Sequence, residues 1–276
     1  MYLFYFTIIT GLLYIYTSLI SRKSPTIEAF SHKSSNSYDK DDMFDSTYVF
    51  IADQLFFDKE YYNNFCKVII KYLNSVYNNH LSIGIKHGGH INELLKNNTN
   101  KTTSITDSNV LTHFCNYNYP SNTYKFVSNY DEDSYIFQEN TFTHISIIDK
   151  EIYSNKNING LLYNCYKWLT HKGYLFIEVF DNVHDLKKQM SNGNANSKFI
   201  RVKYNYTNNI QELNNSRFHF KEQFKLSNNK IKKNIHEIVY NDIEYIKNIA
   251  NKIGFVYTTY IQNISNGRSV LIFQKS

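Results

Sequence analysis

The segment from Leu81 to His90 combines residue types that can bind an anionic group of a ligand. Leu81 to Ile85 has the pattern of a short strand, Gly88 and Gly89 form a turn, and a helix is predicted to begin at His90. Glycine lets the backbone pass close to a ligand, and the free N–H groups at the start of a helix attract negative charge. This order predicts a ligand-binding turn, although a fold can also keep such a turn without binding anything.

An acidic residue follows this turn at the spacing expected for a nucleoside site. Asp107 lies 19 residues after Gly88, close to the roughly 20-residue interval at which a carboxylate meets the hydroxyl groups of a ribose. Asp107 also precedes Ser108, which is well placed to cap a helix predicted over 109–116. A ribose contact and a place in the helix cap are therefore both open for Asp107.

The end of a buried strand is a second candidate place. The run 143–149 (THISIID) is predicted to be a buried strand, and its last residues, Ile148 and Asp149, would line the crevice at the carboxyl edge of a sheet. Two histidines, His219 and His236, fall in a later segment with an antiparallel pattern. One of them could face a substrate, while an ordinary surface or core role is the simpler explanation.

Other chemistries find little support in the sequence. His87, His90 and Glu93 offer metal ligands, but their spacing is not that of a helical zinc site and no cysteine is near. The sequence contains neither a Gly-x-Ser-x-Gly elbow nor a Gly-x-x-x-x-Gly-Lys-Ser/Thr loop. We therefore predict no metal site, no hydrolase triad and no P-loop.

The elements that must position these residues alternate between strand and helix. Strands are predicted over 81–85, 103–106, 124–127, 143–149 and 174–180, and helices over 59–78, 90–96, 109–116 and 158–169. Such alternation predicts parallel βαβ units with right-handed crossovers and hence an open, doubly wound α/β sheet.

The C-terminal third departs from this rhythm. The runs 217–226 and 235–240 alternate with a period of two, which predicts an antiparallel insertion. A helix is expected over 242–252, followed by strands over 255–261 and 269–274. The Asn266-Gly267 pair between these strands is the strongest short signal for a hairpin.

Residues 1–20 form a separate, uncharged segment. Twenty helical residues span the roughly 30 Å hydrocarbon core of a bilayer, so we predict a single transmembrane anchor, with a signal peptide and a buried helix as alternatives. Arg22 and Lys23 follow directly, which places the rest of the chain on the cytosolic side. Residues 21–43 are polar and are predicted to be a linker, and residues 44–276 to be one folded domain.

The composition agrees with a folded domain in a reducing compartment. The 276 residues are 42% hydrophobic and contain nine glycines and two prolines, which excludes collagen-like chains and Pro-rich linkers. The net charge of +6 comes from scattered lysines, so no nucleic-acid groove is indicated. Cys66, Cys115 and Cys165 form no CxxC pair and no plausible disulfide framework.

The order of these parts resembles a class I S-adenosylmethionine-dependent methyltransferase. The matching stretches are the glycine turn, the strand 143–149, the segment LLYNCYKWLTHKGYLFIEV over 161–179, and the tail from 243 to 276 with its Gly-Phe pair and hairpin. The resemblance implies a Rossmann-like, mostly parallel seven-stranded sheet with an antiparallel last strand and helices on both faces. The many Asn, Lys, Tyr, Phe and Ile residues indicate a bias toward AT-rich codons, and this bias and the predicted anchor also resemble proteins encoded by large DNA viruses.

The resemblance implies a set of residues that bind the cofactor, S-adenosylmethionine. The family pattern acidic-x-Gly-x-Gly-x-Gly falls on residues 82–88, where Gly84 and Gly88 match but Ser82 replaces the acidic residue and Lys86 the middle glycine. The carry-over set is Ser82, Gly84, Ile85, Lys86, Gly88, Asp107 for the ribose, Asp131 for the adenine, Ile148 and Asp149. Asp131 belongs to an acidic run that a solvated loop explains equally well.

The function expected from the sequence is therefore a membrane-anchored methyltransferase of unknown acceptor that uses S-adenosylmethionine. The alternative is a methyltransferase-like domain that binds no cofactor and acts as a membrane-attached binding or structural module. Lys86 and Ser82 favour the alternative, because a lysine near the sulfonium adds repulsion and a serine cannot hold the cofactor's ammonium as a carboxylate does. Gly84, Gly88 and Asp107 favour the enzyme.

Overall fold

The computed structural model describes residues 36–37, 46–56, 58–73, 77–84, 90–95, 97–119, 123–191, 204–226 and 231–276. The predicted anchor (1–20) and residues 85–89 of the glycine turn, which include Ile85, Lys86 and Gly88, lie outside these ranges. Among the helices in the described ranges, none has the length and apolar character needed to cross a bilayer.

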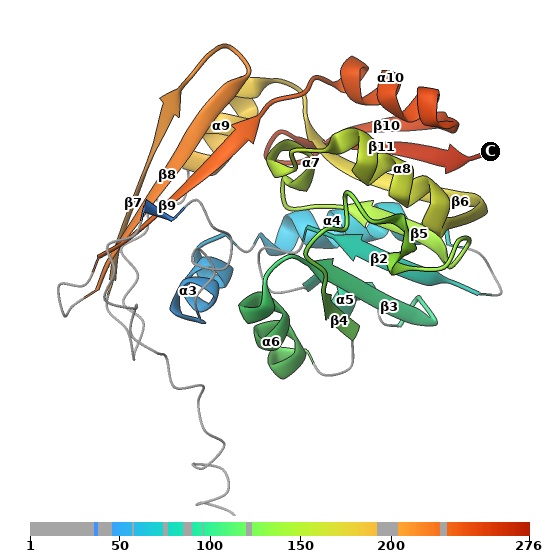
Figure 1. The fold of residues 1–276 in the computed structure, drawn as a ribbon, viewed down its shortest axis with the longest axis horizontal. Coiled ribbons are helices and arrows are strands. Elements are labelled where there is room, and N and C mark those ends of the chain that lie inside the picture. Colours follow the sequence, from blue (N-terminus) through green and yellow to red (C-terminus); the bar gives the residue numbers. More distant parts are fainter. Residues whose placement is uncertain are drawn as a thin grey trace, which may run out of the picture.

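A seven-stranded sheet forms the centre of the fold (Figure 1). Its order is β10-β11-β6-β5-β2-β3-β4. The strands are β2 (Asn79–Ile83), β3 (Lys101–Thr106), β4 (Thr123–Phe126), β5 (Phe142–Ile147), β6 (Leu169–Phe180), β10 (Phe255–Ser265) and β11 (Arg268–Lys275). The strands from β4 to β6 pair in parallel, whereas β11 is antiparallel to both β6 and β10. The predicted Rossmann-like sheet and its antiparallel last strand are confirmed.

Helices cover both faces of this sheet, as predicted. They are α3 (Ser46–Phe56), α4 (Lys59–Ile70), α5 (His90–Leu95), α6 (Asn109–Asn118), α7 (Glu151–Ser154), α8 (Ile158–Trp168), α9 (Val183–Ser191) and α10 (Ile243–Ile253). On one face α8 and α10 pack against Leu175, Ile177 and Val179 of β6. On the other face α4 and α6 share a core with Phe176, because successive side chains of a strand point to opposite faces.

Local sequence signals account for several boundaries of these elements. Ser108 caps α6 by accepting a hydrogen bond from the backbone N–H of Leu111 at 3.2 Å. Asn266 and Gly267 both have positive φ, 49° and 76°, so the predicted Asn-Gly hairpin between β10 and β11 is confirmed. The helix predicted over 59–78 is shorter than expected, since α4 ends at Ile70.

A second, four-stranded sheet in the order β1-β9-β8-β7 stands beside the large sheet (Figure 1). β7 (Tyr204–Glu212), β8 (Arg217–Leu226) and β9 (Ile231–Val239) are antiparallel, and the short β1 (Asn36–Ser37) pairs in parallel with β9. The predicted antiparallel insertion is thereby confirmed, and its sheet has two strands that were not expected, β7 and the short β1. α3 packs against this insertion through Tyr48, whose ring meets Phe224 edge-on at 5.3 Å between centroids.

Two histidines are buried on the face of the large sheet that α4 covers. The side chain of His80 is fully buried, and its Nε2 lies 3.0 Å from Oγ of Ser146. His144 Nε2 lies 2.9 Å from the carbonyl oxygen of Tyr72. Burial, together with the neighbouring His144, lowers the pKa of His80 from 6.5 to about 3. His80 is therefore neutral in the folded protein at ordinary pH.

This pKa predicts that the protein loses stability in mild acid. The unfolded chain binds a proton at His80 as the pH falls below 6.5, while the folded chain does not until about pH 3. We expect the free energy of unfolding to fall by about 2 kcal/mol from this group between about pH 7 and about pH 5. Urea titrations of His80→Asn and of an exposed control, His171→Asn, would test this. If the free energy of unfolding had the same pH dependence in the unsubstituted protein and in both variants, the prediction would be contradicted.

Candidate functional site

The carboxyl ends of the central parallel strands meet at Gly84, directly after β2. Gly84 has φ +89°, a conformation that side chains disfavour. A Cβ at this position would lie 2.4 Å from Cβ of Glu151 and 2.6 Å from the carbonyl oxygen of Ile148. The close approach that requires glycine here is made by the loop after β5 and by α7, so the glycine is needed by the fold whether or not a ligand binds nearby.

Glu151, the first residue of α7, is buried at this edge and has several donors around it. Its carboxylate accepts a hydrogen bond from the hydroxyl of Tyr130 and lies 3.4 Å from Nδ2 of Asn155. Burial, then the charge of Glu151 and then that of Asp107, raise the pKa of the Tyr130 hydroxyl well above its ordinary value. Tyr130 therefore connects the ends of β3 and β4 with α7, a link that the sequence analysis missed.

Asp149 lies at the end of β5, where the sequence analysis placed it. The side chain is 5% exposed, and its carboxylate accepts a hydrogen bond from the hydroxyl of Tyr62 in α4. The backbone N–H of Asp149 donates to Oε2 of Glu178 at 2.8 Å. Asp149 and Lys150 both adopt positive φ, 54° and 64°, which turns the chain sharply between β5 and α7.

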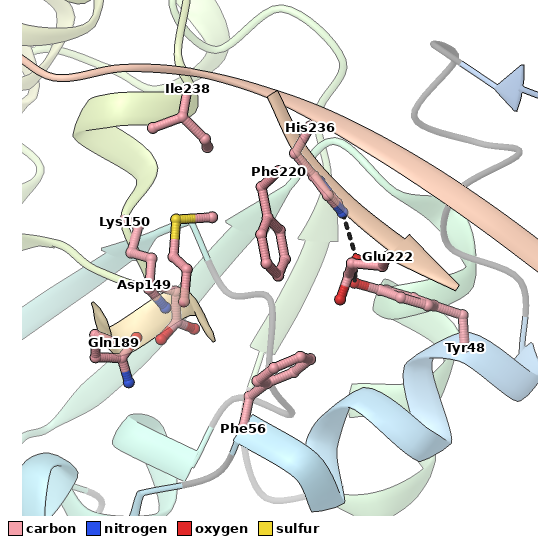
Figure 2. A pocket seen from close by; sticks show the side chains of 10 residues that line it. Tyr48, Phe56, Asp149, Lys150, Gln189, Phe220, Glu222, His236 and Ile238 are labelled. Carbon is pink, nitrogen blue, oxygen red and sulfur yellow. Dashed lines mark hydrogen bonds and ion pairs between the residues drawn. The ribbon is translucent and has the colours of Figure 1, made fainter. Parts of the chain in front are cut away.

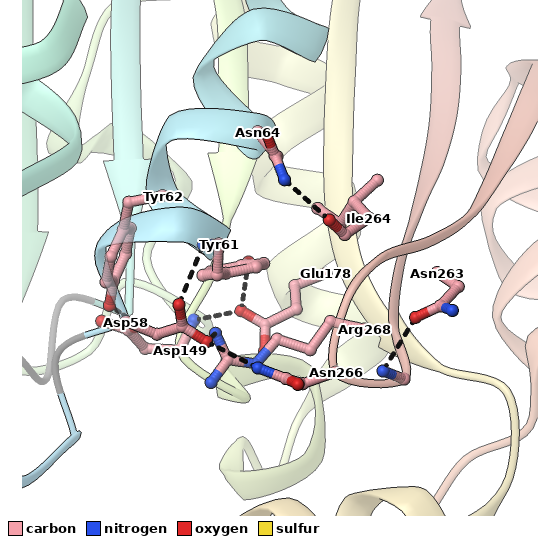
Figure 3. A network of polar contacts seen from close by, with 11 residues as sticks. Asp58, Tyr61, Tyr62, Asn64, Asp149, Glu178, Asn263, Ile264, Asn266 and Arg268 are labelled. Atoms are coloured by element: carbon pink, nitrogen blue, oxygen red, sulfur yellow. Dashed lines mark hydrogen bonds and ion pairs between the residues drawn. The ribbon is translucent and has the colours of Figure 1, made fainter.

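A buried charged network lies beside Asp149 (Figure 3). Glu178, near the end of β6, accepts a hydrogen bond from the hydroxyl of Tyr61 at 2.6 Å. Arg268, at the start of β11, is 4% exposed, and its guanidinium stacks 4.1 Å from the centroid of the Tyr61 ring. Burial is the largest single influence on Arg268 and would lower its pKa, but Glu178, Tyr61, Tyr62 and Asp58 together outweigh burial and raise that pKa. The network fixes α4 against the strand ends.

A pocket lies between the carboxyl edge of the large sheet and the insertion (Figure 2). The empty space in the pocket, together with the part that is open to solvent, has a volume of about 480 Å³. Its lining comes from α3, the loop after β5, α9, β8 and β9: Tyr48, Phe56, Asp149, Lys150, Gln189, Met190, Phe220, Glu222, His236 and Ile238. Asp149 and Lys150 thus connect the pocket with the strand ends at Gly84.

One wall of the pocket holds an ion pair that the sequence did not indicate. Nε2 of His236 lies 2.6 Å from Oε2 of Glu222. The Glu222 side chain is 1% exposed and also accepts hydrogen bonds from the hydroxyls of Tyr48 and Tyr206, each at 2.9 Å. Of the two histidines considered from the sequence, His236 lines the pocket and His219 does not.

The structure brings some of the expected cofactor residues together. Gly84, Ile148 and Asp149 share the carboxyl edge, and Asp107 and Asp131 both act on Tyr130 through their charges. Since Ser108 supplies the side chain that caps α6, the carboxylate of Asp107 is not the capping group.

The side chain of Ser82 does not face a ligand at the strand ends. Its side chain is fully buried on the face that α4 covers, 3.5 Å from Nδ1 of His80 and 3.4 Å from Oγ of Ser146.

No group of at least three potential metal ligands occurs in the described ranges. Cys66, Cys115 and Cys165 are buried free thiols, and burial raises the pKa of Cys66 to about 12.

The fold is similar to those of solved S-adenosylmethionine-dependent methyltransferases. One from Clostridium acetobutylicum aligns with a TM-score of 0.65 and 14% identity, over 82% of this chain and 97% of that chain. CalS10, an amino pentose methyltransferase from Micromonospora echinaspora solved with S-adenosylmethionine bound, gives 0.60 and 9% identity, over 82% and 95%.

The sugar N-methyltransferase KedS8 from Streptoalloteichus gives a TM-score of 0.59 and 8% identity, over 79% of this chain and 88% of that chain. No protein-family model matches the sequence, and no curated protein matches it. The similarity to these solved structures shows that the chain has the class I, Rossmann-like methyltransferase fold. The viral origin suggested by the codon bias stays a prediction.

Proposed function

We propose that the chain is an S-adenosylmethionine-dependent methyltransferase whose acceptor enters the pocket between the large sheet and the insertion. The observation that carries the proposal is the position of this pocket, which shares Asp149 with the carboxyl edge of the sheet. In open α/β folds this edge is where ligands bind, so a cofactor at the strand ends and an acceptor in the pocket would adjoin each other. The likeness to solved methyltransferases supports the same assignment.

The described residues fit the nucleoside half of the cofactor better than its amino-acid half. Asp107 is half-buried at the end of β3 and offers a carboxylate for the ribose hydroxyls, with Asp131 and Tyr130 nearby. At the amino-acid end, Ser82 supplies no carboxylate, and Asp149 is one of the acidic side chains at the same edge that would balance the ammonium and sulfonium charges. When bound, S-adenosylmethionine supplies an electrophilic methyl group, and the chain's part is to position the acceptor.

A second candidate is a methyltransferase-like domain that binds no cofactor. Two observations favour it: the hydroxyl of Ser82 is turned into the sheet beside His80, and the side chain of Glu151 packs directly against Gly84. Such a domain would act through what it binds or tethers.

A comparison of carboxylate variants would separate the two candidates. If the strand ends bind S-adenosylmethionine, the cofactor should raise the melting temperature of the full-length protein, and Asp107→Ala should weaken binding by about 1–3 kcal/mol, the cost of a charge-assisted hydrogen bond to the ribose. Glu244→Ala, which removes an exposed carboxylate of α10, serves as the control and should bind as the unsubstituted protein does. Equal binding by Asp107→Ala would contradict the ribose contact.

We further propose that residues 1–20 anchor the domain in a membrane, with the domain on the cytosolic side. The support is the uncharged sequence of that segment and the basic pair that follows it. The full-length protein should pellet with membranes and resist extraction with alkaline carbonate, while a chain beginning at residue 43 should stay in the supernatant. Release of the full-length protein by carbonate would contradict the anchor.

A further inference from the structure

A buried carboxylate orients a histidine in the wall of the pocket (Figure 2). Glu222 on β8 receives hydrogen bonds from three donors: the hydroxyls of Tyr48 and Tyr206 and Nε2 of His236. The Glu222 side chain is nearly inaccessible, whereas His236 keeps 18% of its side chain exposed. Tyr48, Glu222 and His236 all line the pocket, and of the ion-paired two the imidazole is the more exposed.

The hydrogen bonds determine where the protons lie. Burial by itself would raise the pKa of Glu222, but the charge of His236 and the hydrogen bonds from its three donors outweigh burial and hold that pKa below its ordinary value. The pKa values of Tyr48 and Tyr206 are raised by burial and by the charge of Glu222, so both hydroxyls keep their protons. An ionised Glu222 therefore accepts the Nε2 proton of His236, so Nδ1 is the ring nitrogen that carries the lone pair when the imidazole is in its neutral form.

The other charged and titratable groups of the pocket and of the Glu222 cluster come from five segments. They are Tyr48 of α3, Tyr206 of β7, Glu222 of β8, Lys232 of β9, and Asp149 and Lys150 of the loop after β5. Within the part of the chain that the structure describes, Glu222 is the carboxylate in hydrogen-bond contact with His236, and no residue there bonds to Nδ1.

The remaining lining defines the kind of molecule that would fit. Phe56, Met190, Phe220 and Ile238 give the pocket apolar walls, and the ring of Phe220 lies 5.8 Å from that of His236. The pocket is lined by ten side chains, which suits a small molecule rather than a peptide or a polynucleotide. Apolar walls beside the basic groups of His236 and Lys150 favour a small aromatic compound that carries an acidic hydroxyl group.

We propose that His236, oriented by Glu222, is the general base that takes the hydroxyl proton of a small phenol-type acceptor in this pocket; this rests on the proposed function. In the transfer, the proton moves from the hydroxyl to Nδ1 of His236 while the oxygen forms a bond to the methyl carbon. The bond from that carbon to the sulfonium sulfur breaks, and its electron pair stays on sulfur. Glu222 acts as a positioning residue that stabilises the imidazolium.

A coloured phenol tests the base without any methyl transfer. 4-Nitrophenol absorbs visible light only as the phenolate, so binding beside a proton acceptor should produce phenolate absorbance at a pH where the free compound is mostly protonated. We expect this absorbance with the unsubstituted full-length protein. His236→Gln should lose it and bind at least about tenfold more weakly, as expected for one charge-assisted hydrogen bond. His219→Gln, on the neighbouring strand, is the matched control and should be unchanged.

A second ligand tests the role of the hydroxyl proton in the unsubstituted protein, so the result does not depend on whether His236→Gln folds. 4-Nitroanisole has the same ring but no proton to give, so it should bind the unsubstituted protein more weakly than 4-nitrophenol does. Equal affinity for the two compounds, or phenolate absorbance that persists in His236→Gln, would overturn the inference. A phenolate signal without any binding of S-adenosylmethionine would overturn the methyl transfer, while cofactor binding without the phenolate signal would overturn only the role of His236.

Discussion

Arg268→Met is expected to lower the free energy of unfolding by about 3–5 kcal/mol, because it removes one partner of a buried charged network. Glu178 is 1% exposed and would lose the guanidinium whose charge acts on it in the folded state. The hydrogen bonds from Tyr61 and from the backbone of Asp149 would remain, but they do not supply a compensating charge. Denaturant titration of the purified variant measures the effect.

The double variant Arg268→Met with Glu178→Gln is the matched control. When both charges are removed, no buried carboxylate is left alone, so the double variant should be more stable than Arg268→Met by itself. If Arg268→Met unfolds within about 1 kcal/mol of the unsubstituted protein, the network does not contribute in the way described here.

Gly84→Ala should be the second severe change, with a loss of about 2–5 kcal/mol in unfolding free energy. The alanine would have to adopt a left-handed φ, which costs about 1–2 kcal/mol, and its Cβ would overlap Glu151 and the backbone of Ile148, which adds about 1–3 kcal/mol. Gly254→Ala is the matched control, because Gly254 also has positive φ, +118°, but its Cβ would meet only the end of the Tyr166 side chain at 3.1 Å.

The difference between the two glycine variants isolates the contact with α7. Gly84→Ala combined with Glu151→Gly, which removes the Cβ that would lie 2.4 Å away, should recover part of the loss, although the carbonyl of Ile148 would still lie 2.6 Å away. Equal melting temperatures for Gly84→Ala and Gly254→Ala would show that Glu151 does not press on Gly84. The result would also show whether the fold itself requires glycine at position 84, independently of any ligand at the strand ends.

The sheet could be predicted from the sequence because its signals are local. Buried parallel strands appear as apolar runs such as 143–149, and the Asn266-Gly267 pair specifies its turn by backbone conformation alone. β7 was missed because the run YNYTNNIQE has too few apolar residues to show a period of two. α3 was missed because its apolar residues give no clear stripe, as it packs between the core and the insertion.

The candidate site was only partly predictable, because its key contacts join distant parts of the chain. Tyr48 and Glu222 are 174 positions apart, and only the docking of α3 on the insertion brings them together. His236 could be named as a candidate, but nothing in the sequence distinguishes it from His219, since the difference is which side of the insertion borders the pocket. Asp149 could be placed from the rule for strand ends, which depends on topology rather than on a particular partner.

Isothermal titration of the full-length protein with S-adenosylmethionine shows whether the strand ends bind the cofactor. We expect saturable heat with one cofactor bound per chain, and the same heat from a chain that carries His236→Gln, because the histidine belongs to the acceptor pocket and not to the cofactor site. No heat at millimolar cofactor, in a protein that retains its cooperative unfolding, would contradict the methyltransferase assignment and leave the domain as a module that only binds or tethers.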